Sequence, residues 1–504
     1  MAIPLVLLMV VLTGCQAVGG VDVSQAIANN TKVKSGESKQ SMHINIEPDK
    51  QLATDEALVM IKRINSISLN IDHAKMKDTD TASVKGSLNM DGTKLPFHLS
   101  VDKSGMTIDV DGAQKPVYIS LDTLGGAETM LPLDTKELEK QMQELSPKVL
   151  TFVMKHLSNP KNISVTPVQE TVNGETLSLN KLHMEINGEE LLAMVKPFLT
   201  SIAKDEQGLK QLIGDLYDVL YPVFESYMGL EGIEGMEDDE VTSILPKSKE
   251  EAVTSIYDMI KEGLDSVLVN YDEELNNLLK DTPELKTVFG PETKLNMDFF
   301  VDSKLDIRKQ NMSLKVAVPA SEDLPVRAVT LSADSELWNI GGAVTVDEVD
   351  ASRGVMELAE GEVTPGQVLR NFDSNSFVYQ FLKNEMKIST KSIFLHPSEE
   401  NGAITVKNTT FVPLRYLSEQ LDAEVKWTKG SKQIIVIDDM TGDEVVLTVG
   451  SSKATVAGQE VTMVESAFVG KNGKTYVPLR FMAESLGATV EKEQDTGWIF
   501  IDRN

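Results

Sequence analysis

FVPLRYLSEQL at residues 411–421 and YVPLRFMAESL at residues 476–486 are two copies of one pattern, and they decide the fold of the C-terminal part of the chain. In both, a β-favouring pair precedes a proline, which fixes φ and lacks an N–H, so it suits the first position of a helix. Leucine or methionine then recurs at i, i+3 and i+7, on one helical face. Apolar runs separated by a polar turn follow each copy. Each copy is therefore predicted to form a strand, a helix and a hairpin.

Residues from about 388 to 504 resemble the copper amine oxidase N-terminal-like domain, which occurs in duplicate in many secreted and envelope proteins of Gram-positive bacteria. The resemblance rests on Thr-Phe-Val-Pro-Leu-Arg at 410–415, on Thr-Tyr-Val-Pro-Leu-Arg at 475–480, and on Val449-Gly450-Ser451 between the copies. It implies a small extracytoplasmic α+β domain, and it indicates a location better than an activity. The copies differ in the hairpin, where the first has Trp427 and the second has Lys492.

Arg415 and Arg480 occupy the same early position in the two predicted helices, where a cation opposes the helix dipole. Each precedes a glutamate, Glu419 or Glu484, by four residues, and such an exposed pair contributes only about 0.3 to 0.5 kcal/mol. Two explanations remain open. The guanidinium ties the helix to a carbonyl or carboxylate of the neighbouring hairpin, or it presents donors to an external anionic ligand. We favour the tie, because in both copies the arginine accompanies an apolar helix face.

The N-terminus resembles a bacterial lipoprotein signal. Residues 1–14 are predicted to be a signal peptide, because the apolar run from Ile3 to Leu12 is too short to span a membrane. Leu12-Thr13-Gly14-Cys15 resembles a lipobox in which Cys15 receives the diacylglyceryl anchor. A short buried strand with a chance cysteine is the alternative. Residues 15–40 contain glycine, asparagine and serine without apolar periodicity, which predicts a flexible tether.

Residues 41–352 are predicted to form a large α+β domain. Apolar residues alternate with polar ones between 67 and 121 and again between 295 and 331, and Asp91-Gly92 and Asp111-Gly112 are hairpin signals. Helical periodicity occurs near 134–156, 191–220 and 253–278, and these helices need an apolar sheet face to cover. With the stretches 172–176 and 181–191, the combination resembles envelope lipoproteins of the LolA and LppX type, whose curved half-barrel sheet encloses a lipid-sized cavity. An ordinary filled α+β core is favoured over such a cavity. Residues 353–387 are predicted to be a linker helix.

Composition narrows the functional classes. The chain has 504 residues and a net charge of −29, which argues against nucleic acid as a partner. The six histidines never stand at metal-binding spacings, and the acidic run at 231–240 lacks EF-hand spacing, so a solvated loop is favoured there. We expect no cofactor and no metal, copper included, because the C-terminal domain contains His396 as its one histidine and no cysteine.

These observations predict a lipoprotein on the extracytoplasmic face of the cell membrane with a non-catalytic binding role between membrane and wall. Its expected partners are the membrane, through the lipid anchor, and a cell-wall polymer, an envelope protein or a hydrophobic small molecule. A carrier of a hydrophobic ligand in a cavity between sheet and helices is the first alternative. An envelope hydrolase is the second, although the sequence contains no recognisable catalytic motif.

Overall fold

The computed structural model describes residues 19–121, 135–228, 248–358, 363–396, 403–427, 430–493 and 495–504. The chain divides into two compact units. Unit 1 comprises Met1–Met106 and Leu124–Glu348, and unit 2 comprises Thr107–Thr123 and Val349–Asn504. The predicted signal peptide, Cys15 and the acidic run at 231–240 lie outside the described residues.

Unit 1 is built on one antiparallel sheet whose strands follow the order β4-β3-β2-β1-β11-β10-β9-β8-β7. The strands are β1 (Gly36–Pro48), β2 (Ser68–Met76), β3 (Ala82–Met90), β4 (Thr93–Val101), β7 (Asn162–Val172), β8 (Glu175–Asn187), β9 (Lys294–Val301), β10 (Ile307–Ala317) and β11 (Val326–Trp338). The two predicted meanders thus form one sheet, because β1 pairs with β2 on one side and with β11 on the other. Asp91 and Gly92 both have positive φ between β3 and β4, which confirms the predicted tight turn.

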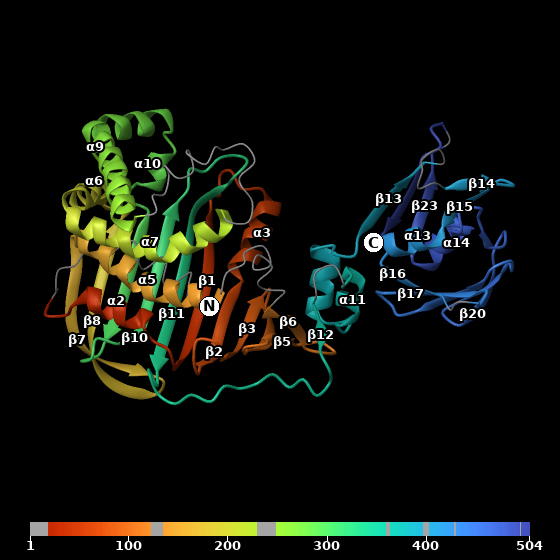
Figure 1. The fold of residues 1–504 in the computed structure, drawn as a ribbon, viewed down its shortest axis with the longest axis horizontal. Helices are drawn as coiled ribbons and strands as arrows, with labels where there is room; N and C mark the ends of the chain where they lie inside the picture. The colour runs from red at the N-terminus through yellow and green to blue at the C-terminus, as the bar shows by residue number, and fades with distance from the viewer. Residues whose placement is uncertain are drawn as a thin grey trace. The chain divides into compact units, whose positions relative to one another are not determined.

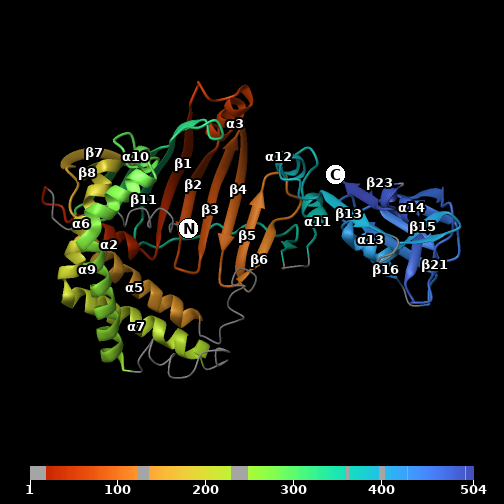
Figure 2. The same ribbon diagram turned by 90° about the horizontal axis from the view of Figure 1, so that it is seen from above.

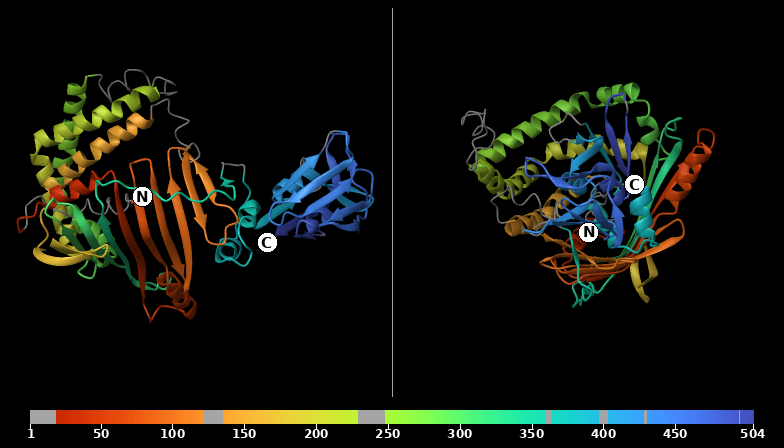
Figure 3. Two further views of the ribbon diagram at one scale, coloured as in Figure 1. Left: turned by 90° about the horizontal axis from the view of Figure 1, so that it is seen from below. Right: turned by 90° about the vertical axis from the view of Figure 1, so that its right-hand side faces the viewer.

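The helices of unit 1 are α2 (Val23–Thr31), α3 (Asp55–Asn65), α5 (Thr135–His156), α6 (Gly188–Lys204), α7 (Glu206–Met228), α9 (Lys249–Asp281) and α10 (Leu285–Val288). Helices α2, α5, α6 and α7 lie over one face of the sheet (Figure 1), and α9 packs on α6 and α7. Helices α5 and α7 run across the sheet (Figure 1), α3 lies at one end of the strands (Figure 2), and the sheet curls beneath the helices (Figure 3). Sheets with packed helices confirm the predicted α+β class and its half-barrel. Within the described residues, no helix combines the length and the apolar character needed to span a membrane.

The centre of unit 1 is a row of methionines. Met184, Met297 and Met312 stand in register on β8, β9 and β10, and the row continues through Ala333 to Met42. They belong to one buried cluster with Ile27 of α2, Leu150 and Met154 of α5 and Met194 of α6. Unbranched methionine fills irregular gaps between a curled sheet and crossing helices. Over β8 to β10 the sheet face is therefore a filled core.

The prediction of a flexible tether over residues 15–40 is wrong for its described part. Residues 23–31 form α2, with the Asp22 side chain accepting from the Gln25 N–H at 2.9 Å, and β1 begins at Gly36. Val23, Ala26 and Ile27 are buried against the methionine row. Their i, i+3, i+4 spacing is a short amphipathic pattern that the surrounding asparagines and glycines obscured.

His156 is a buried histidine of unit 1 whose surroundings shift its pKa. Its ring is buried between Phe152, the Ser201 hydroxyl at 2.8 Å from Nδ1, and the Asp205 carboxylate at 3.1 Å from Nε2. Burial lowers the pKa of His156, Asp205 opposes that shift, and Lys155 adds to it. A histidine with a lowered folded pKa contributes stability above its unfolded pKa of about 6.5, and that stability is lost as pH falls toward the folded value.

We therefore expect the melting temperature of unit 1 to fall as the pH drops below the unfolded histidine pKa of about 6.5 in the wild type, and to fall less in His156→Gln. The glutamine retains hydrogen-bonding groups but does not titrate. Thermal unfolding followed by circular dichroism at several pH values measures the difference. Parallel curves for the two proteins would contradict the assignment.

Unit 2 contains the two predicted repeats. The first copy is β15 (Thr409–Pro413), α13 (Leu414–Gln420), β16 (Ala423–Trp427) and β17 (Gln433–Asp438); the second is β22 (Thr475–Pro478), α14 (Leu479–Ser485), β23 (Ala488–Lys492) and β24 (Ile499–Arg503). The remaining strands of this region are β13 (Lys391–Leu395), β14 (Ile404–Val406), β18 (Glu444–Thr448), β19 (Lys453–Val456), β20 (Gln459–Thr462) and β21 (Phe468–Val469). We call residues 391–504 the C-terminal module. Each copy has the predicted order of strand, helix and hairpin, although both prolines cap their helices and the first helical residue is the next leucine.

The two copies meet through their first strands. β15 pairs antiparallel with β22 symmetrically about Val412 and Val477, and α13 and α14 lie over that pair. Outer sheets β13-β24-β23 and β16-β17-β18-β19-β20 complete the module. One apolar cluster joins both copies, and its largest fully buried members include Leu417, Leu421, Met482 and Leu486. The copies therefore share a core.

The linker differs from the single helix predicted over 353–387. Its helical segments are α11 (Pro365–Arg370), α12 (Phe377–Gln380) and the π-helical η2 (Phe381–Glu385). Helix α11 ends at Arg370 with Asn371 as its C-cap, and Ser376 caps α12. Elsewhere in unit 2, β12 (Met356–Glu357) pairs in parallel with β6 (Val117–Ser120), and β5 (Gly105–Val110) spans the boundary between the units. Asp439 of the module accepts from Thr364 at 2.9 Å and from Gln367 at 3.2 Å, which holds α11 against the module.

Candidate binding pocket

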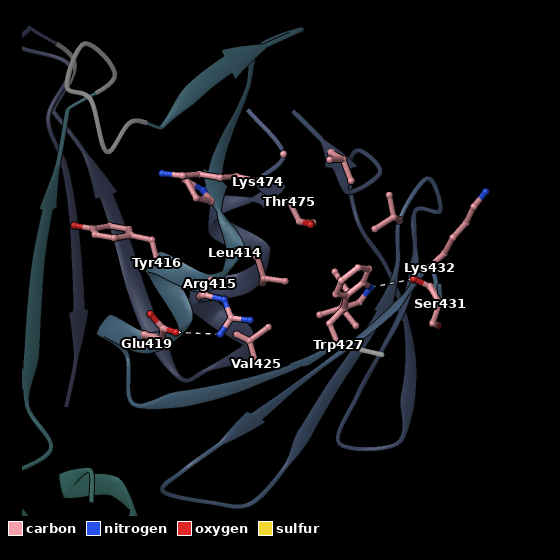
Figure 4. A pocket seen from close by; sticks show the side chains of 15 residues that line it. Leu414, Arg415, Tyr416, Glu419, Val425, Trp427, Ser431, Lys432, Lys474 and Thr475 are labelled. Atoms are coloured by element: carbon pink, nitrogen blue, oxygen red, sulfur yellow. Dashed lines mark hydrogen bonds and ion pairs between the residues drawn. The ribbon is translucent and has the colours of Figure 1, made fainter. Parts of the chain in front are cut away.

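A pocket of about 720 Å³ lies beside the N-terminal end of α13. Its walls come from α13, the β16–β17 hairpin and the turn that precedes β22, so both copies contribute to it. Its lining residues are Pro413, Leu414, Arg415, Tyr416, Glu419, Val425, Trp427, Ser431, Lys432, Ile434, Val449, Val469, Gly473, Lys474 and Thr475. We call it the α13 pocket, and Figure 4 shows it.

Trp427 supplies the largest apolar surface of the α13 pocket. It ends β16, where it stands opposite Ile434, and 57% of the residue is exposed. Its indole Nε1 donates to the Ser431 carbonyl at 2.9 Å, which fixes the plane of the ring at the pocket wall (Figure 4). An exposed indole held in one orientation is an unusual use of so much apolar area, and it is typical of ligand contact.

Lys474 reaches the pocket from the second copy. The turn at 470–475 is held by the Gly470 N–H donating to the Lys474 carbonyl at 2.9 Å, and by the Lys474 N–H donating to Asn472 Oδ1 at 3.1 Å. Asn472 also donates to the Tyr476 hydroxyl at 3.0 Å, and the Tyr476 ring stacks on Phe468. The backbone that carries Lys474 is therefore fixed, while its side chain is exposed.

The predicted arginines lie on the surface of their helices. Arg415 Nη1 donates to Glu419 Oε1 at 3.2 Å, and Arg480 Nη1 donates to Glu484 Oε1 at 3.3 Å. The side chains of Arg415 and Arg480 are 63% and 61% exposed. Within the described residues neither guanidinium contacts a carbonyl or carboxylate of the hairpin. The predicted structural tie between helix and hairpin is therefore not formed by either arginine. Arg415 lines the α13 pocket, and Arg480 belongs to the other copy.

Exposed pairs of this kind have little effect on folding. We expect Arg415→Met and Arg480→Met each to change the free energy of unfolding by less than about 0.5 kcal/mol, because solvent screens the pair and two long side chains lose freedom in forming it. Urea unfolding of the full chain, read from the tryptophan fluorescence, checks this. A loss above about 1.5 kcal/mol in either variant would restore the structural explanation.

Two other groups of side chains contain residue types that occur in metal or catalytic sites. His396 Nε2 lies 3.1 Å from the Thr496 carbonyl and its ring packs on Trp498, and no group of three or more His, Cys, Asp or Glu suited to a metal occurs in the described part of the chain. The absence of copper stays a prediction. In unit 1, Ser164, His183 and Asp298 stand in register on adjacent strands, with His183 Nδ1 2.7 Å from Asp298 Oδ1.

The Ser164, His183 and Asp298 cluster has the residue types of a hydrolase, but its surroundings differ from those of a catalytic site. Lys181 Nζ binds the other Asp298 oxygen at 2.9 Å, so the carboxylate belongs to an ion-pair ladder. Ser164 is exposed on β7, the edge strand. A strand face is flat, whereas substrates are held in concave sites.

The sequence predicts part of the α13 pocket. Arg415 and Glu419 are predicted candidate ligand contacts, and both line it. Tyr416, Lys432 and Lys474 also line it and carry no signal in the sequence. Trp427 is a position where the copies differ, and that difference is the signal that the sequence offers for it.

A family model described as the copper amine oxidase N-terminal domain matches residues 397–501, which confirms a domain of this kind at the predicted place. The match covers a minority of the chain and includes every residue of the α13 pocket. A search of curated proteins found no match.

Proposed function

We propose that this chain is an extracytoplasmic lipoprotein, anchored through Cys15, whose C-terminal module binds cell-wall material without catalysis. The observation that carries the proposal is the α13 pocket. Its volume of about 720 Å³ falls within the range of ligand sites, roughly 300 to 1,000 Å³. The domain family to which the module is similar supports a location outside the cytoplasm.

The pocket's chemistry favours binding over turnover. Its lining contains the hydroxyls of Tyr416, Ser431 and Thr475 but neither histidine nor cysteine, and its carboxylate, Glu419, is paired with Arg415. A hydrolytic serine needs a base within hydrogen-bond reach. The lining residues supply apolar contact and hydrogen-bonding groups, which are what recognition requires.

A tryptophan substitution tests this function. We expect Trp427→Ala in the full chain without its signal peptide to weaken cosedimentation with isolated Gram-positive cell walls about tenfold, equivalent to about 1.4 kcal/mol. Phe394→Ala is the matched control, because Phe394 lies on β13 of the same module and is also 57% exposed. Equal wall binding by the wild type and Trp427→Ala would overturn the proposal.

The anchor is tested separately. Cys15→Ser removes the thiol that would carry the diacylglyceryl group, and two acyl chains supply most of the membrane affinity of such a protein. We expect the variant to move from the membrane fraction to the soluble fraction when expressed in a Gram-positive host. Unchanged partition would contradict lipidation at this cysteine.

A carrier of a hydrophobic ligand is the second candidate, and a groove in unit 1 favours it. Two adjoining pockets of about 670 and 680 Å³ lie between α6 and α9. Both are lined by Leu192, Tyr271, Leu275, Leu279 and Phe289. This apolar surface is separate from the filled methionine row, and it lies between helices rather than between the sheet and the helices. Lipid extracted from purified unlipidated protein would support the carrier function.

A further inference from the structure

We infer that the ligand of the α13 pocket is an anionic glycan, and this inference rests on the proposed function. The residues that line the pocket carry more positive than negative charge, whereas the whole chain is acidic. Acidic residues outnumber Lys and Arg by 77 to 48 in the whole sequence, whereas the pocket has Arg415, Lys432 and Lys474 against Glu419 alone. Salt at physiological strength screens charges beyond about 8 Å, so the local cations decide what enters.

The cations come from separate parts of the module. Arg415 lies on α13, Lys432 directly precedes β17, and Lys474 lies in the turn before β22. All three are exposed, and neither lysine forms an ion pair with another described residue. Figure 4 shows Arg415 and Trp427 on facing walls, with Lys474 and Thr475 nearer one end. In Figure 4 Arg415 is the cation that faces the indole across the pocket, while the Lys432 amine points away from Trp427 and the two exposed lysines stand at the pocket margins.

The apolar part of the pocket requires a ligand with an apolar face. The lining includes Val425, Val449 and Val469 besides Trp427. Tyr416 lies on the far side of Arg415 from Trp427 (Figure 4). The C–H face of a sugar ring covers an indole well, and the sugar hydroxyls can pair with Ser431 and Thr475. A bare phosphate or carboxylate would leave the indole in water. A purely apolar ligand would desolvate the lysines without pairing them.

The second copy supplies a natural comparison. It keeps the pair of Arg480 and Glu484 with nearly the same distance and exposure as Arg415 and Glu419. At the position of Trp427, however, it has Lys492. The ion pair between arginine and glutamate thus occurs in both copies, whereas the tryptophan occurs in the first copy and not in the second. Arg480 is therefore a matched control for Arg415.

Binding of defined polymers to the full chain without its signal peptide tests the inference. The probes are glycosylated poly(ribitol phosphate), hyaluronate, dextran and inorganic polyphosphate, which separate phosphate from carboxylate and charge from sugar. We expect at least one of the two anionic glycans to bind more than tenfold tighter than dextran and polyphosphate, and to lose affinity as salt rises. Arg415→Gln and Lys474→Ala should each weaken that binding severalfold, and Arg480→Gln should leave it unchanged.

The outcomes separate this inference from the proposed function. Dextran binding as tight as either anionic glycan, still lost in Trp427→Ala, would overturn the requirement for charge while the wall-binding function stands. Polyphosphate binding as tight as the glycans would overturn the requirement for sugar. A preference for poly(ribitol phosphate) or for hyaluronate supports the inference and assigns the anion. If Trp427→Ala binds cell walls as tightly as the wild type, both the proposed function and this inference are overturned.

Discussion

Arg503→Met should lower the free energy of unfolding of unit 2 by about 3 to 5 kcal/mol, because it leaves a buried carboxylate without its cation. The Arg503 and Asp438 side chains are 3% and 7% exposed. Arg503 Nη2 donates to both Asp438 oxygens, at 2.8 and 2.6 Å, and Nη1 donates to the Leu421 carbonyl at the end of α13. One side chain of the second copy thus holds β17 and α13 of the first. Without it, Asp438 keeps the Met440 N–H as a donor at 2.8 Å.

The double variant Arg503→Met/Asp438→Leu is the control. Replacing both members of a buried ion pair with apolar groups removes the unpaired charge, and such changes are often neutral. We expect it to recover most of the stability that the single variant loses. Urea unfolding of the full chain can follow unit 2 through Trp427 and Trp498. A loss below about 1 kcal/mol in Arg503→Met would show that the pair contributes little.

Local patterns predicted the elements of this fold well where the signal lay within a few residues. Strict alternation identified the strands of both meanders, and Asp91-Gly92 identified its turn, because two successive residues with positive φ suit aspartate and glycine. The repeat predicted both helices of the C-terminal module from the spacing of their buried residues. The filled row of Met184, Met297 and Met312 could not be predicted, since it depends on the register of three strands.

Tertiary contacts explain the remaining differences. α2 has few strong helix formers, and the burial of Val23 and Ile27 stabilises it. The sequence predicts that Arg415 binds the neighbouring hairpin, whereas its guanidinium lies along its own helix and donates to Glu419. The α13 pocket itself arises because β15 and β22 pair, which brings a turn of the second copy beside the first helix. No local pattern contains that pairing.

Leu417→Ala should lower the free energy of unfolding of unit 2 by about 2 to 5 kcal/mol. Leu417 is fully buried in α13, within the cluster that joins the two copies. Truncation removes apolar contact and leaves a cavity that a shared, close-packed core cannot readily collapse. Val464→Ala is the control, because Val464 is 85% exposed and its truncation should cost less than about 0.5 kcal/mol.

The same variant separates the two faces of α13. Leu417 points into the core, while Arg415 and Glu419 of the same helix line the pocket. At a temperature where Leu417→Ala is still folded by circular dichroism, we therefore expect it to bind cell walls as the wild type does. Trp427→Ala should show the opposite behaviour, with unchanged unfolding and weakened binding. If Leu417→Ala loses wall binding while folded, the pocket depends on the packing of the core and the two faces do not act independently.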